Sequence, residues 1–75
     1  MDYTFLGAEQ RIEIVRQRIA QMEQEHYQRE LDRKIAERLD DGAGAQMLAE
    51  AIAAQEIIES AHAVALAELV ELERQ

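Results

Sequence analysis

The feature of this sequence that most constrains its fold is a single interruption, Asp40-Asp41-Gly42-Ala43-Gly44, between two long stretches of helix-favouring residues. The chain has 75 residues, no proline and three glycines, two of which lie in this interruption. Alanine, leucine, glutamate, glutamine and arginine lose little side-chain freedom in a helix. The sequence therefore predicts an all-α chain with an N-terminal arm at 1–7, helices at 8–39 and 45–75, and a turn at 40–44.

The first predicted helix has one apolar stripe whose members recur at alternating steps of three and four residues, which is heptad spacing. This stripe comprises Phe5, Ala8, Ile12, Val15, Ile19, Met22 and His26. Beyond His26 the apolar residues change side, because Tyr27, Leu31, Ile35 and Leu39 recur every four residues. The change indicates either a stutter in a coiled coil or a second contact face. We expect Thr4 or Gly7 to cap the start of this helix, and Gly42 or Gly44 to end it in the left-handed conformation.

The second predicted helix carries two apolar surfaces. One comprises Leu48, Ile52, Gln55, Glu59, His62, Leu66 and Leu69, and the other Met47, Ala51, Ala54, Ile58, Ala61 and Ala65. One partner helix cannot cover both surfaces, and a chain of this length rarely builds a sufficient core alone. We therefore expect an antiparallel two-helix hairpin that self-associates into a four-helix bundle. The residues expected to carry self-association are Ile12, Val15, Ile19, Met22, Ile52, Ile58, Leu66 and Leu69.

Folding about residues 42 and 43 places each residue i opposite a residue near 85 − i. This register brings His26 opposite Glu59 and Glu23 opposite His62. Three ion pairs between the helices are also expected: Arg29 with Glu56, Arg18 with Glu68, and Arg11 with Glu73. Exposed pairs of this kind influence register more than they stabilise the fold.

A polar layer thus interrupts the apolar stripes, and it has two interpretations. Glu23, His26, Glu30, Glu59 and His62 resemble the ligand set of ferritin-like di-iron and di-manganese proteins, in which glutamate and Glu-x-x-His groups face into a four-helix bundle. This resemblance implies bound iron or manganese, with a single zinc ion as a further alternative. The other interpretation, which we favour, is a hydrogen-bonded layer without a cofactor that fixes register and oligomeric state.

Composition excludes several functions. There is no cysteine, so disulfides and cysteine-based zinc sites are ruled out. The net charge is −8, and residues 45–75 contain six glutamates but only one basic residue, Arg74. Direct binding of nucleic acid is therefore disfavoured. Ser60 has no catalytic-triad context, so no catalytic residues are assigned and an enzyme is not expected.

No apolar run is long enough to span a membrane, and the N-terminus lacks a signal-peptide pattern. We expect a cytoplasmic protein, or one inside a virion or another compartment. Tyr3, Phe5 and Leu6 are the expected anchors for a protein partner. The sequence thus predicts an acidic accessory subunit, adaptor or inhibitor, of a kind common in phage and mobile elements. A metal-carboxylate protein and an acidic mimic of nucleic acid are the alternatives.

Overall fold

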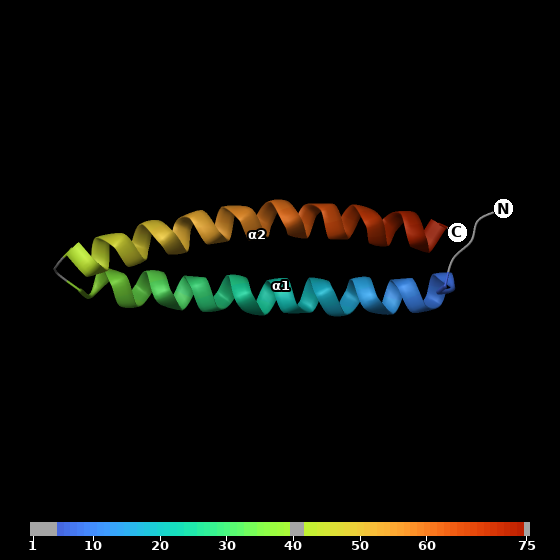
Figure 1. The fold of residues 1–75 in the computed structure, drawn as a ribbon, viewed down its shortest axis with the longest axis horizontal. Coiled ribbons are helices and arrows are strands. Elements are labelled where there is room, and N and C mark those ends of the chain that lie inside the picture. The colour runs from blue at the N-terminus through green and yellow to red at the C-terminus, as the bar shows by residue number, and fades with distance from the viewer. Residues whose placement is uncertain (1–4, 40–41, 75) are drawn as a thin grey trace.

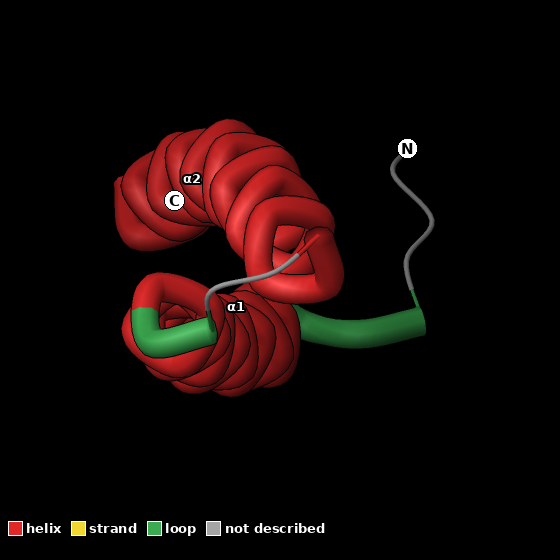
Figure 2. Tube along the Cα trace, turned by 90° about the vertical axis from the view of Figure 1, so that its left-hand side faces the viewer, coloured by secondary structure: helices red, strands yellow, loops and turns green. Residues whose placement is uncertain are grey.

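The computed structural model describes residues 5–39 and 42–74, and it shows two long helices that run antiparallel (Figure 1). Helix α1 spans Ala8–Glu37 and helix α2 spans Gly42–Arg74. The helices pack against each other, and α2 curves over α1 when viewed from the end (Figure 2). The result is a rod of 58 × 19 × 15 Å. The predicted all-α hairpin is confirmed, and the described residues contain no strand.

Local hydrogen bonds define both ends of α1. Gly7 is the N-cap residue, and its backbone N–H donates to Oε1 of Gln10 at 2.8 Å. The alternative cap, Thr4, lies outside the described residues. At the other end, the N–H groups of Arg38 and Leu39 donate to carbonyls three residues earlier. These shorter-range bonds tighten the last turn and satisfy carbonyls that the helix itself leaves unpaired.

The role predicted for the turn glycines is wrong. Gly42 and Gly44 both lie inside α2, which begins three residues earlier than expected, and neither has a positive φ. Gly44 is buried, and a Cβ atom there would lie 2.6 Å from the carbonyl oxygen of Leu39 and 2.9 Å from that of Ala36. Glycine is therefore required at position 44 because the two backbones approach closely, and not because the chain needs a left-handed residue.

The seam between the helices follows heptad spacing along both of them. The α1 residues with this spacing are Ile12, Val15, Ile19, Met22, His26, Arg29, Arg33 and Ala36, and those of α2 are Gly44, Leu48, Ala51, Gln55, Ile58, His62, Ala65, Leu69 and Leu72. Each of these residues is buried or half-buried. The predicted spacing is confirmed from Ile12 to His26 and continues without a stutter to Ala36, whereas Phe5 and Ala8, the first two members of the predicted stripe, are exposed.

Two predicted features of the apolar stripes need correction. In α2, Ile52, Glu59 and Leu66 are exposed, because the seam runs between the two predicted surfaces and takes residues from each. The residues of the first predicted helix that change side after His26 stay exposed in the hairpin, which favours a second contact face over a stutter. These exposed residues are Tyr27, Leu31, Ile35 and Leu39.

The hairpin buries few apolar side chains. Among the described residues only Ile19, Ala36, Ala51 and Leu72 are buried apolar residues, and two of these are alanines. Twelve large apolar side chains within residues 5–39 and 42–74 are exposed. Neither described helix is apolar over a stretch long enough to cross a bilayer.

Candidate functional site

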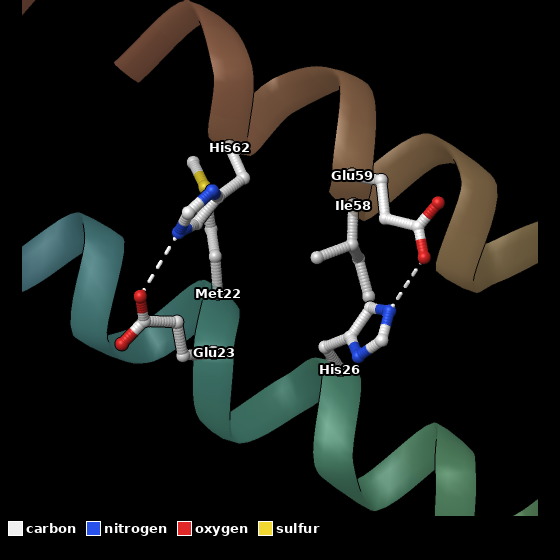
Figure 3. A pocket seen from close by; sticks show the side chains of 6 residues that line it. All are labelled: Met22, Glu23, His26, Ile58, Glu59 and His62. Atoms are coloured by element: carbon white, nitrogen blue, oxygen red, sulfur yellow. Dashed lines mark hydrogen bonds and ion pairs between the residues drawn. The ribbon is translucent and has the colours of Figure 1, made fainter. Parts of the chain in front are cut away.

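Two histidine–glutamate pairs join α1 to α2 near the middle of the seam (Figure 3). Nε2 of His26 lies 2.8 Å from Oε2 of Glu59, and Nε2 of His62 lies 3.0 Å from Oε2 of Glu23. An ionised carboxylate only accepts hydrogen bonds, so each imidazole donates through Nε2. In both pairs the residue numbers sum to 85, which is the predicted register. The juxtaposition expected from the sequence is confirmed.

The two pairs are equivalent because the same short pattern occurs once in each helix. Glu23 and His26 are three residues apart in α1, as are Glu59 and His62 in α2. On a helix this spacing directs two side chains to the same face. When two such helices pack antiparallel, the histidine of each meets the glutamate of the other. The cluster therefore has an approximate two-fold axis across the seam.

Met22 and Ile58 project between the two pairs and complete a groove of about 300 Å³. The imidazoles are partly covered, with 36% of the His26 side chain and 27% of His62 exposed. Both glutamate side chains are more than 60% exposed. The pairs are therefore hydrated at their outer edge, where a single ion pair adds at most about 1 kcal/mol to stability.

The described residues contain no group of three histidine or carboxylate side chains placed to hold one metal ion. Each pair supplies one imidazole and one carboxylate, whereas zinc takes four ligands. Glu30, the fifth member of the predicted ligand set, belongs to neither histidine–glutamate pair. Its Oε1 accepts a hydrogen bond from Nε2 of Gln55 at 3.2 Å. Its Oε1 is also 3.8 Å from Arg33. A metal centre of the predicted kind would need ligands from a second hairpin, so that interpretation stays a prediction.

Gln55 connects a second polar cluster beside the histidine–glutamate layer. Only 3% of this residue is exposed. Its Oε1 accepts from Nη1 of Arg33 at 2.8 Å, and its Nε2 donates to the carbonyl of His26 at 3.3 Å and to Glu30. No described buried side-chain polar atom lacks a partner. Arg33 was not identified from the sequence, because an arginine at a heptad core position looks like a gap in an apolar stripe.

The residues predicted for self-association fall into two groups. Ile12, Val15, Ile19, Met22, Ile58 and Leu69 all lie along the seam of the single hairpin. Ile52 and Leu66 are exposed beside that seam. Most of the predicted set is thus used within one chain, and any contact with another copy must draw on additional residues. Assignment of the full set to self-association stays a prediction.

The N-terminal arm is described only in part. Phe5 is 94% exposed and Leu6 is 38% exposed. Tyr3, the third predicted anchor, lies outside the described residues. The prediction that these residues bind a protein partner therefore has two exposed apolar side chains in its favour.

None of the three predicted ion pairs between the helices, including Arg18 with Glu68, forms among the described residues. Glu73 accepts from Arg16 at 2.9 Å and not from Arg11. Arg29 pairs with Asp32 of its own helix at 3.5 Å. In an antiparallel pair, an arginine five residues further along the helix can reach the same carboxylate, as Arg16 does in place of Arg11, so spacing alone does not select the partner.

Sequence reasoning missed an apolar groove on the flank of the seam opposite the histidine–glutamate pairs. Its exposed walls include Ile14 and Val64, two apolar residues that lie outside both predicted stripes. The available signal was the presence of such residues at outer heptad positions, where polar residues are the norm. Comparison of this chain with known protein families, curated proteins and solved structures gave no significant match.

Proposed function

We propose that this protein is a small acidic assembly module, which self-associates into a helical bundle and acts by binding another protein. The observation that carries the proposal is the imbalance between its buried and exposed apolar residues. Four apolar side chains are buried and twelve large ones are exposed among the described residues. A core of this size leaves little net stability after the conformational entropy cost of ordering two helices of 30 and 33 residues.

Burial against another chain supplies what the hairpin lacks. Isolated hairpins of this size are stabilised by disulfides, metals or association, and the chain has no cysteine. Exposed apolar residues occur along both helices, for example Ile14 and Ile35 on α1 and Ile57 and Val64 on α2. A four-helix bundle formed by two hairpins is the simplest assembly that covers surfaces on both helices.

Charge suggests the kind of protein that the assembled module binds. The described part of α2 carries six glutamates and a single arginine, so its outer surface is strongly acidic. Such a surface steers association towards a basic protein surface and repels nucleic acid. An accessory subunit, adaptor or inhibitor of a basic protein fits this charge distribution.

The test of the proposal is sedimentation equilibrium across a hundredfold range of protein concentration, combined with thermal melts at the same concentrations. We expect a defined oligomer at high concentration and a melting temperature that rises with concentration, because association stabilises the folded state by mass action. A protein that stays monomeric and melts cooperatively at one temperature throughout the range would contradict the proposal.

A further inference from the structure

The apolar groove opposite the histidine–glutamate pairs, which we call the flank groove, is formed by both helices. Val15 of α1 and Ala65 of α2 lie half-buried along the seam at its floor. Ile14 and Val64 form its walls and are 52% and 71% exposed. The groove has a volume of about 680 Å³, and small alanine side chains on its α2 side allow another helix to approach closely.

Two opposite charges face each other across the flank groove. Arg18 lies on the α1 side and Glu68 on the α2 side, and both line the groove. Their residue numbers sum to 86, close to the 85 of the histidine–glutamate pairs, so they lie at nearly the same height along the rod. The groove is thus positive on one edge and negative on the other at a single level.

We propose that the flank groove is the contact surface for a second copy of this chain, related by a two-fold axis parallel to the helices. This inference rests on the proposed self-association and specifies its surface and geometry. In this arrangement α1 of each copy lies on α2 of the other, and both turns are at the same end of the bundle. The contact is isologous, because the same patch is used by both copies.

Charge complementarity selects this axis. With the axis parallel to the helices, Arg18 of each copy lies opposite Glu68 of the other, so two attractive pairs form at the rims of the apolar contact. With the axis across the rod at the level of the groove, α1 lies on α1 and α2 on α2. That arrangement brings Arg18 against Arg18 and Glu68 against Glu68. Like charges facing each other across an interface disfavour the second geometry.

The size of the face fits a dimer contact. One long face of the rod measures 58 by 19 Å, an area on the order of 1,000 Å². Standard stable interfaces cover about 800 Å² of each partner. A second hairpin laid along the flank groove therefore reaches the area of a stable interface, and it also covers Ile57 and Val64 of α2, which are 70% and 71% exposed in the single hairpin.

The main test uses two charge-reversal variants and their mixture. Arg18→Glu gives a groove with two negative rims, and Glu68→Arg gives one with two positive rims. We expect each variant alone to raise the dimer dissociation constant about tenfold or more, because like charges then meet twice across the interface. In an equimolar mixture every facing pair is attractive again, so a heterodimer should form with nearly the affinity of the original homodimer.

Matched controls separate this effect from a general effect of net charge. Lys34→Glu and Glu56→Arg make the same charge changes at exposed positions that do not line the flank groove. We expect little change in affinity from either control. A mixture that stays as weak as its two components would show that Arg18 and Glu68 do not pair between copies. Single variants that dimerise as well as the original chain would exclude the flank groove as the interface.

The orientation is tested by a distance between copies. The chain has no cysteine, so Gln46→Cys introduces a single site for a spin label on the exposed side of α2 near the turn. Parallel copies place the two labels within about 35 Å, since neighbouring helices lie 8–10 Å apart. Antiparallel copies centred on the groove separate them by more than about 50 Å, at 1.5 Å per residue. The long distance would overturn the proposed axis, whereas a monomer at all concentrations would instead contradict the proposed function.

Discussion

The two ends of the hairpin are held together in different ways. At the open end, branched and long apolar residues such as Ile19 and Leu72 fill the seam. At the turn end, Gly44, Ala36 and Ala51 let the backbones come close, and Arg33 and Gln55 hydrogen-bond where apolar side chains would otherwise pack. The open end therefore depends on large apolar side chains that fill the seam. The turn end depends on small residues that allow close packing and on polar side chains whose hydrogen bonds are satisfied. Removing atoms should damage the open end, and adding them should damage the turn end.

Leu72→Ala should have the largest effect on stability. Leu72 is 3% exposed, and truncating a buried leucine costs about 2–5 kcal/mol through lost burial and an unfilled cavity. Urea denaturation at one fixed protein concentration measures the change. Val70→Ala, at a residue that is 48% exposed two positions earlier, is the control and should cost less than about 1 kcal/mol. Similar losses for both variants would show that the open end is not held by packing of Leu72.

Gly44→Ala should be the next most harmful change, although it adds only one methyl group. The new Cβ atom would meet the backbone oxygens of Leu39 and Ala36 at 2.6 and 2.9 Å, so the two backbones must separate at the turn. Overpacking of this kind costs about 1–3 kcal/mol. The matched variant Gly42→Ala meets nothing within 4 Å in the same helix, and it should stabilise the protein by about 0.4–1 kcal/mol. The same denaturation experiment measures both variants. If Gly44→Ala were as stable as Gly42→Ala, the close approach at the turn would be refuted.

The histidine–glutamate layer between the two ends should contribute least. His62→Leu should change the free energy of unfolding by less than about 1 kcal/mol, because its partner Glu23 is largely exposed. A double-mutant cycle with Glu23→Gln should return a coupling energy below about 1 kcal/mol. Added zinc should leave the melting temperature unchanged. A zinc-dependent rise that is lost in His62→Leu would favour the metal interpretation instead.

The helices, their antiparallel order and the pairing of His26 with Glu59 could be predicted because they depend on periodicity and on one short interruption. The composition of the α2 seam could not be predicted as well. Ala51 and Ile58 lie one position before Ile52 and Glu59, and a stripe drawn through either set has helical spacing. Supercoiling of α2 around α1 decides between them, and that depends on both helices at once.

The position of Gly44 shows a different limit of sequence reasoning. Glycine after a helix usually indicates a left-handed C-cap, which is a local preference of one residue. Here the requirement comes from Ala36 in the last turn of α1 and from Leu39 just after that helix, whose atoms lie within 3 Å of the position of the missing Cβ. The site was therefore predicted best where both partners carried distinctive side chains, as in Glu23 and His62. It was predicted least well where the important feature was an empty volume or an outward-facing apolar residue such as Val64.

The crossed histidine–glutamate pairs specify the register in which the two helices pack. If α2 slipped by one heptad along α1, His26 would face Ile52 or Leu66 and lose its carboxylate in either direction, whereas His62 would face Arg16 in one direction and Glu30 in the other. The aliphatic parts of the seam tolerate such a slip far better, since one branched side chain replaces another. The layer thus adds little to the free energy of unfolding, but it favours the native register over registers shifted by one heptad. The same pairs would set the register if α1 packed against α2 of another copy through these residues.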